Sequence, residues 1–169
     1  MNSTLSSWNA ASEDAALDAM ISCCGARRWA KAMVALRPIS NVAELSAAAD
    51  QVWSTMEEAD WLEAFACHPR IGEHKAAHAS EQSAAWSSQE QSTASAAAER
   101  VLAELAAGNV LYEQRFGFTY IVCATGRSAE EMLVILNRRL ASNRASELRE
   151  AAEQQRQITQ IRLGKWLIE

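Results

Sequence analysis

The chain has 169 residues, 49% of them apolar, and a formal net charge of −5 spread along its length. This length predicts one domain, 1–169, with a proper core. Without a basic block, nucleic-acid binding is disfavoured, and no apolar stretch approaches the roughly 20 residues that span a bilayer. Since a signal-peptide pattern is also absent, we expect a cytoplasmic protein with neither a membrane nor a nucleic-acid partner, which leaves a small anionic ligand possible.

The cysteine pattern excludes the usual disulfide and zinc frameworks. The four cysteines are Cys23, Cys24, Cys67 and Cys123. They include one adjacent pair and no C-x-x-C motif, which fits neither a disulfide scaffold nor a common zinc ligand set. We therefore predict reduced, buried thiols.

The first half of the chain is typical of short, capped helices, because alanine is abundant and glycine is sparse. Ser12 and Asn41 each precede a run that opens with acidic or apolar residues at helical spacing, so each is predicted to be an N-cap. Between them, residues 26–36 are predicted to be helical. That helix ends at Arg37-Pro38 because a residue before proline is disfavoured in the α region.

The middle of the chain continues the helical pattern with one interruption. A helix over residues 61–66 is predicted to stop at His68, before a second proline. Residues 76–98 are rich in Ala, Ser and Gln but contain neither proline nor glycine, and most of them are predicted to be helical. A helix beginning near Ser88 continues to residue 105, and Gly108-Asn109 marks its expected break.

Residues 118–124 form the only strand-like run. A lone strand cannot satisfy its own backbone hydrogen bonds, so we expect a short, extended, buried segment instead of a sheet. After it, Ser128 opens a helix with a capping box, and the last helix starts near Asn143. The fold class predicted is all-α: a single-domain helical bundle with one extended buried segment.

The last helix carries a cation on its apolar side. Its stripe is Leu148, Ala151, Ile158, Ile161 and Trp166. At 100° per residue, Arg162 falls between Ile158 and Trp166. Either Arg162 is a surface residue, or it faces inward and must be paired, in which case a carboxylate is the partner that the guanidinium geometry favours.

Two further polar groups have both a structural and a functional interpretation. His68 could cap the C-terminus of its helix or face a cleft as a catalytic group. Ser87 and Glu90 form a capping box, but a helix N-terminus could equally hold a polar or anionic ligand.

One acidic residue and two histidines lie close together in the sequence, as in some metal sites. Glu73, His74 and His78 could lie on one helical face, but no further ligand is arranged around them. We interpret the histidines as solvated surface residues and predict no metal.

An ordered set of short motifs along nearly the whole chain resembles the 2-oxo-4-hydroxy-4-carboxy-5-ureidoimidazoline decarboxylase family. The motifs are Cys24-Gly25, Trp29, Arg37-Pro38, Trp53, Leu62-Glu63-Ala64-Phe65, His68-Pro69-Arg70-Ile71-Gly72, Ser87-x-x-Glu90-Gln91, Tyr112-x-x-Arg115-Phe116-Gly117-Phe118, Gly126, Arg138-Arg139-Leu140 and Arg162-Leu163. The His-Pro-Arg-Ile-Gly element is the most specific. The sequence departs from the family at Thr119-Tyr120, where proline followed by an aromatic residue is usual.

The resemblance implies a lyase of urate (purine) catabolism that releases carbon dioxide from a small anionic ureidoimidazoline and yields S-allantoin. It also implies an all-α fold, commonly a homodimer, with no cofactor. By resemblance, His68, Glu90 and Arg162 are catalytic. The residues expected to bind substrate are Pro69, Ser87, Ser88, Gln89, Gln91, Tyr120, Ile121, Val122, Cys123 and Ala124.

Two other functions remain open from the residues alone. A non-catalytic helical binding protein would use the tryptophans as core and the polar set as caps, and would show no turnover. A metal-assisted hydrolase of ureides would use Glu73, His74 and His78, and would contain bound metal.

Overall fold

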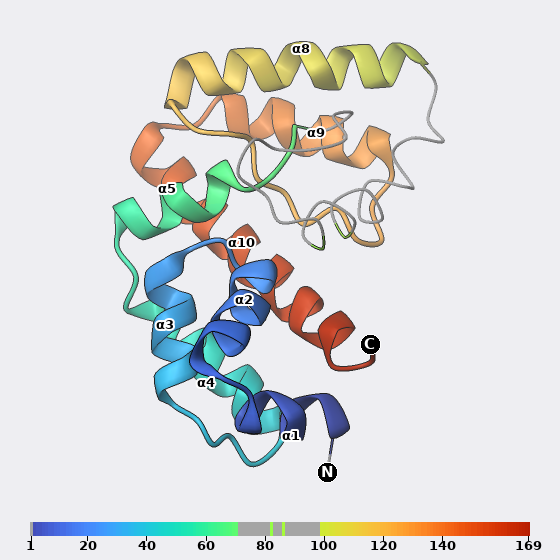
Figure 1. Cartoon of the computed structure of the whole chain (residues 1–169). Helices are drawn as coiled ribbons and strands as arrows, with labels where there is room; N and C mark the ends of the chain where they lie inside the picture. Colours follow the sequence, from blue (N-terminus) through green and yellow to red (C-terminus); the bar gives the residue numbers. More distant parts are fainter. Residues whose placement is uncertain (1, 71–81, 83–85, 87–98) are drawn as a thin grey trace. The chain divides into compact units, whose positions relative to one another are not determined.

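The computed structural model describes residues 2–70, 82, 86 and 99–169. These residues are mainly helical, and none of those described is in a strand (Figure 1). The helices are α1 Ser3–Ala10, α2 Glu13–Cys23, α3 Arg27–Ala35, α4 Val42–Ser54, α5 Glu58–Ala66, α8 Glu99–Phe116, α9 Ala129–Leu140 and α10 Arg144–Trp166. The all-α prediction is confirmed, and no helix in the described part of the chain has the length and apolarity to cross a membrane.

The chain divides into two compact units. One comprises Met1–Ala64 with Arg156–Glu169, and the other comprises Phe65–Gln155. Helix α10 therefore contributes residues to both units. The single domain predicted from the length stays a prediction.

In the first unit, helices α1 to α4 pack in chain order, α2 on α3 and α3 on α4. Both predicted N-caps are confirmed, because Ser12 Oγ accepts from Ala15 N at 3.3 Å and Asn41 Oδ1 accepts from Glu44 N at 2.9 Å. The indole of the fully buried Trp29 donates to Ala49 O at 3.1 Å and so ties α3 to α4.

The end of α3 before Pro38 was predicted from the sequence, but helix α1 was not. Helix α3 ends at Ala35, just before Arg37-Pro38, as predicted. Helix α1 was not predicted. It is eight residues long, and Asn2 caps it by accepting from Leu5 N at 2.9 Å.

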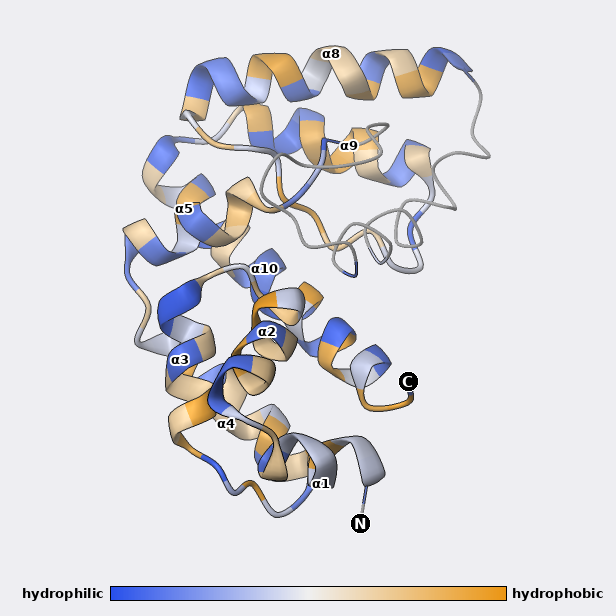
Figure 2. Ribbon diagram, in the orientation of Figure 1, coloured by the Kyte–Doolittle hydropathy of each residue, from blue (hydrophilic) through white to orange (hydrophobic). Residues whose placement is uncertain are grey.

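In the second unit, helices α8 and α9 lie side by side (Figure 1). Apolar and polar residues alternate around both helices, as expected where one face is buried (Figure 2). The break predicted at Gly108-Asn109 is wrong, because α8 runs through both residues. Gly108 is buried, and an added Cβ would lie 2.5 Å from Leu136 Cδ2 of α9, so the glycine permits close helix packing.

The segment after α8 confirms the expected extended conformation. Gly117 has a φ of 81° and its N–H donates to Glu113 O at 2.8 Å, which ends the helix. Residues 119–124 then have no helical or strand structure, and Phe118 and Tyr120 to Ala124 are buried. The rings of Tyr112, Phe116, Phe118 and Tyr120 pack together over this segment.

The remaining helix predictions are mostly confirmed. Ser128 and Glu131 form the predicted capping box of α9, and α10 begins at Arg144, next to the predicted start. Of the residues 76–98 that were predicted to be mostly helical, Gln82 and Trp86 are helical, and the others lie outside the described residues. The predicted helix start near Ser88 also lies outside them, and the described part of that helix begins at Glu99.

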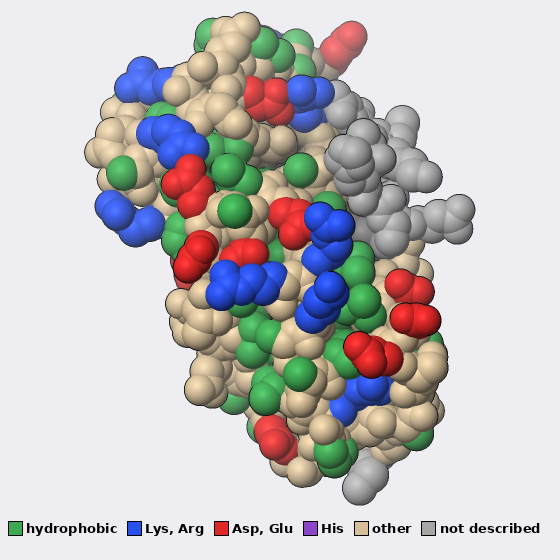
Figure 3. Space-filling view, turned by 60° about the vertical axis from the view of Figure 1, so that its left-hand side comes forward, with side chains coloured by type: hydrophobic (Ala, Val, Ile, Leu, Met, Phe, Trp, Pro, Cys, Tyr) green, Lys and Arg blue, Asp and Glu red, His purple; other side chains and the backbone are tan. Residues whose placement is uncertain are grey.

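The charge distribution agrees with expectation, and the prediction of buried thiols is confirmed for three of the four cysteines but not for Cys67. On the face drawn in Figure 3, basic (blue) and acidic (red) side chains are interspersed. The thiols of Cys23, Cys24 and Cys123 are buried, while that of Cys67 is partly exposed.

Candidate active site

Helix α10 buries an unusual amount of polar surface. Its buried polar residues are Glu147, Gln154, Gln155, Thr159 and Arg162. A buried polar group lowers stability unless it is hydrogen bonded, so each of these side chains needs a partner. Their partners include His68 and the backbone of Cys123, which are both candidate site residues.

His68 is held at a turn directly after α5. Its N–H donates to Phe65 O at 3.1 Å, and the side chain is partly exposed. Next to it, Arg70 binds Glu113 of α8 through two parallel hydrogen bonds, Nε to Oε1 at 2.8 Å and Nη2 to Oε2 at 2.7 Å. This bidentate pair fixes the turn against α8, and Pro69 between the two residues is buried.

The imidazole of His68 contacts α10. Its Nε2 lies 2.7 Å from Gln155 Oε1, and Gln155 is 0% exposed. Residues 68 and 155 are 87 positions apart in the chain. The contact therefore depends on the tertiary fold and gives no local sequence signal.

Side chains supply the hydrogen bonds that the extended segment lacks as a lone strand. Cys123 N donates to Gln154 Oε1 at 2.8 Å, and Cys123 O accepts from Arg127 Nε at 3.0 Å. Ile121 O accepts from Arg139 Nη1 at 2.5 Å. The Tyr120 hydroxyl donates to Met132 O of α9 at 3.2 Å. These bonds explain why a buried segment without secondary structure is stable here.

Consecutive residues of α10 thus hold two predicted parts of the site. Gln154 binds the backbone at Cys123, and Gln155 binds the ring of His68. The structure therefore brings His68 and the Tyr120–Ala124 segment to the same turn of one helix. Sequence reasoning missed both glutamines, although each shares the helical spacing of the apolar stripe.

A buried ion pair underlies the extended segment and was also missed. Arg139 Nε lies 2.8 Å from Glu147 Oε2, with side-chain exposures of only 2% and 3%. The Tyr112 hydroxyl donates to the same carboxylate oxygen at 2.7 Å, and Arg139 Nη2 donates to the Tyr112 oxygen at 3.2 Å. The Arg139 guanidinium also lies 4.9 Å from the centre of the Tyr120 ring.

Burial controls the ionisation of this cluster. It raises the pKa of Tyr112 well above the ordinary value of 10.0; Arg139 acts in the opposite direction and the hydrogen bond to Glu147 adds to the rise. Burial also raises the pKa of Tyr120, which Arg139 partly offsets. Both phenols therefore keep their protons at a pH where an ordinary tyrosine would lose its proton.

Arg162 faces inward, as one of the two interpretations predicted. It lies in the first unit and is only 1% exposed. Burial raises the pKa of the Cys23 thiol, and the positive charge of Arg162 acts in the opposite direction. The charge of Arg162 therefore acts on the Cys23 thiol.

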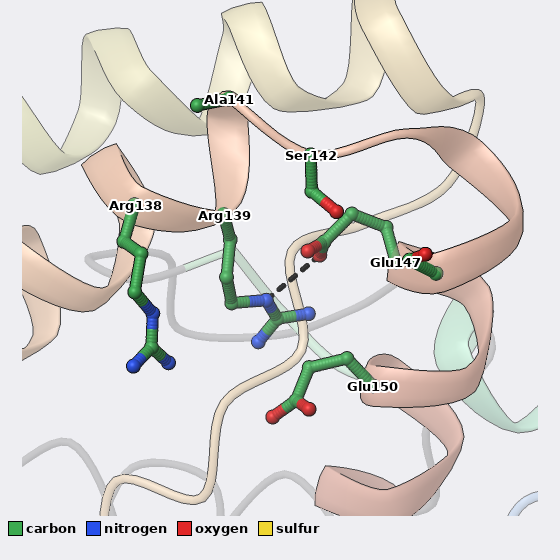
Figure 4. A pocket seen from close by; sticks show the side chains of 7 residues that line it. Arg138, Arg139, Ala141, Ser142, Glu147 and Glu150 are labelled. Carbon is green, nitrogen blue, oxygen red and sulfur yellow. Dashed lines mark hydrogen bonds and ion pairs between the residues drawn. The ribbon is translucent and has the colours of Figure 1, made fainter.

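An open pocket of about 510 Å³ lies in the second unit, where α9 turns into α10 (Figure 4). It is lined by Arg138, Arg139, Ala141, Ser142, Ser146, Glu147 and Glu150. Its lining does not include His68 or the extended segment. Two of the lining residues, Arg139 and Glu147, form an ion pair with each other.

Some candidate residues lie outside the described part of the chain. They are the predicted catalytic Glu90, the predicted binding residues Ser87, Ser88, Gln89 and Gln91, and the alternative metal set Glu73, His74 and His78. Among the residues that are described, no three His, Cys, Asp or Glu side chains are grouped so that they could hold a metal ion.

Residues 9–164 match the family model of OHCU decarboxylase, where OHCU stands for 2-oxo-4-hydroxy-4-carboxy-5-ureidoimidazoline. The chain therefore belongs to that family. It is 40% identical over 144 residues to a uric acid degradation bifunctional protein of Arabidopsis thaliana, which covers 85% of this chain and 44% of that protein. The chain thus spans less than half the length of that relative. A 2-oxo-4-hydroxy-4-carboxy-5-ureidoimidazoline decarboxylase of Amia calva is 27% identical over 127 residues, 75% of this chain and 73% of that protein.

Solved structures agree with this membership. A crystal structure of an OHCU decarboxylase in the presence of (S)-allantoin is 36% identical, with a TM-score of 0.77, and the match covers 90% of this chain and 99% of that one. A structure of (S)-allantoin synthase, 17% identical with a TM-score of 0.71 over 96% of this chain and 53% of that chain, shares the fold.

Proposed function

We propose that this chain decarboxylates 2-oxo-4-hydroxy-4-carboxy-5-ureidoimidazoline to S-allantoin in urate breakdown. The observation that carries the proposal is the family match over residues 9–164, which includes the His68-Pro69-Arg70 element. The anchored position of His68 supports it, because the turn is fixed to α8 through Arg70 and to α10 through the imidazole.

The substrate can supply its own electron sink. The bond between the ring carbon and the carboxylate breaks, carbon dioxide leaves, and the bonding electrons move toward the nitrogen of the ring carbon–nitrogen double bond. That nitrogen takes up one proton from solvent, which is the net proton that the reaction consumes. The neighbouring ring carbon then gains a proton, and the hydroxyl group loses one to become a carbonyl. Most decarboxylases need a cofactor or metal to hold these electrons, and this reaction does not.

The protein then has to orient, desolvate and protonate the substrate. In the proposal, His68 moves a proton between the substrate and the protein, Glu90 orients the reacting centre, and Arg162 binds the carboxylate or a neighbouring oxygen. The residues proposed to bind the substrate are Pro69, Ser87, Ser88, Gln89, Gln91 and the backbone of Tyr120, Ile121, Val122, Cys123 and Ala124. Protonation from one face gives the S product.

The experiment generates the substrate in place with uricase and the hydrolase that follows it, adds the purified chain, and records circular dichroism. Rapid appearance of the S-allantoin signal without added metal or cofactor is the expected result, because the uncatalysed decay gives a racemate. Racemic product at the uncatalysed rate would contradict the proposal and favour the helical binding protein.

Two further parts of the proposal concern the whole protein. A homodimer follows from the family resemblance, and a cytoplasmic location follows from the sequence pattern. Light scattering during size-exclusion chromatography measures the first, and fractionation of cells that express the protein measures the second.

A further inference from the structure

One partner of the His68 imidazole is an amide that is inaccessible to solvent. Gln155 is 0% exposed, and its Oε1 lies 2.7 Å from His68 Nε2. A side chain buried in the middle of a helix has few alternative rotamers, so it holds its partner in a defined position. His68 itself is partly exposed, unlike its partner.

The chemistry of this hydrogen bond limits the protonation of the ring. An amide carbonyl oxygen only accepts, so the proton of the bond must be on His68 Nε2. A neutral imidazole carries one proton, and the nitrogen that lacks it is therefore Nδ1. The bond selects one of the two neutral tautomers.

We infer that Gln155 is a positioning residue that holds His68 in the Nε2–H tautomer, so that Nδ1 is the nitrogen that exchanges a proton with the substrate. The inference rests on the proposed function, since it concerns the step assigned to His68. Neutral His68 takes the proton of the substrate hydroxyl on Nδ1. The resulting imidazolium then returns a proton from the same nitrogen to the ring carbon, and Nε2–H stays bonded to Gln155 throughout.

A nitrogen NMR measurement tests the tautomer directly and requires no turnover. The chain contains three histidines, and the His68→Asn variant identifies the signals of His68 by their loss. In the unmodified protein, at a pH where the ring is neutral, we expect an N–H signal for Nε2 and a lone-pair signal for Nδ1. In Gln155→Leu, which lacks the acceptor, the two nitrogens should approach the averaged shifts of a free imidazole.

Gln154→Leu is the matched control for the spectrum. It removes a buried amide from the neighbouring position of α10, where Gln154 binds Cys123 N and not His68. The His68 nitrogen signals should therefore stay as in the unmodified protein, although both variants lose a buried hydrogen bond.

Kinetics give a second readout. Gln155→Leu should lower kcat by about 10- to 100-fold, the usual effect of removing the partner that orients a functional histidine, with little change in KM. Gln155→Glu keeps an acceptor oxygen at the same place and should recover most of this loss.

Each contrary result has its own meaning. An Nδ1–H tautomer in the unmodified protein, or unchanged signals in Gln155→Leu, would overturn the inference even if the enzyme turns over normally. Equal losses of kcat in the Leu and Glu variants would also overturn it. Racemic product in the presence of an Nε2–H tautomer would instead overturn the proposed function and leave the tautomer assignment standing.

Discussion

Gly108 of α8 lies directly against Leu136 of α9. A Cβ built on Gly108 would be 2.5 Å from Leu136 Cδ2 and 3.3 Å from Leu136 Cγ, and Leu136 is itself 0% exposed. The missing side chain is therefore what lets the two helices approach each other at this point. A glycine that local propensity treats as a helix breaker here serves helix packing.

Replacing Gly108 by Ala should destabilise the protein by about 1–3 kcal/mol, because the fully buried Leu136 side chain would have to shift to accommodate the new methyl group. Urea unfolding measures the change. Gly164→Ala is the matched control: Gly164 lies in α10, and an added Cβ there meets nothing within 4 Å. That substitution should stabilise the protein by roughly 0.5–1 kcal/mol, the ordinary helix-propensity gain. Stabilisation by both substitutions would contradict the packing role.

Local signals account for most of the helix boundaries that could be predicted. Ser12, Asn41 and Ser128 each cap a helix through a hydrogen bond within three residues, which a sequence pattern can reveal. Gly108 was misjudged because its role depends on Leu136, 28 positions further along. The extended segment was predicted correctly because an isolated run of β-branched and aromatic residues has no strand to pair with.

The site could be predicted only in part. Arg162 was found because a cation interrupts an apolar stripe, and His68 because a proline follows it. Gln154, Gln155 and Glu147 share the same helical spacing, but a glutamine or glutamate within such a stripe usually reaches solvent. Their roles depend on Cys123, His68 and Arg139, which only the fold brings to α10.

The buried ion pair predicts a large effect of charge removal. Glu147→Gln leaves the charge of Arg139 buried without its carboxylate, and should lower the free energy of unfolding by about 3–5 kcal/mol. The exposed pair Arg100–Glu104, with side-chain exposures of 87% and 46%, is the control. Glu104→Gln should change stability by less than about 1 kcal/mol. If urea unfolding shows equally small effects for Glu147→Gln and Glu104→Gln, groups other than Glu147 stabilise the buried charge of Arg139.

Alkaline titration tests the burial of the phenols. The chain has two tyrosines, Tyr112 and Tyr120, and the pKa of each is raised above its ordinary value of 10.0, chiefly by burial. The unfolded chain therefore loses protons that the folded chain keeps, and stability falls as the pH rises past about 10. Tyrosinate absorbance should appear only together with the loss of helical circular dichroism. Ionisation near pH 10 in a chain that remains helical would contradict this assignment.

The catalytic assignment of His68 predicts a loss of stereospecific turnover in His68→Asn. Positioned acid–base groups contribute about 10²- to 10⁴-fold, and a loss in that range is expected while the melting temperature changes little. His78→Asn is the control, because that residue was interpreted as a surface histidine. It should keep full activity, and a loss there with bound metal would favour the metal-assisted hydrolase. Normal S-allantoin formation by a folded His68→Asn variant would remove the assignment.

The buried guanidinium of Arg162 predicts that charge alone is not enough at this position. Lysine keeps the positive charge but cannot form two parallel hydrogen bonds to a carboxylate. Losing one charge-assisted hydrogen bond corresponds to roughly a 10- to 100-fold lower kcat/KM for Arg162→Lys. Arg156→Lys is the control on the same helix, since Arg156 is partly exposed and pairs with Asp50 at 3.0 Å. If both variants fold and have the same kcat/KM as the unmodified protein, Arg162 does not bind the substrate, and its burial has a purely structural cause.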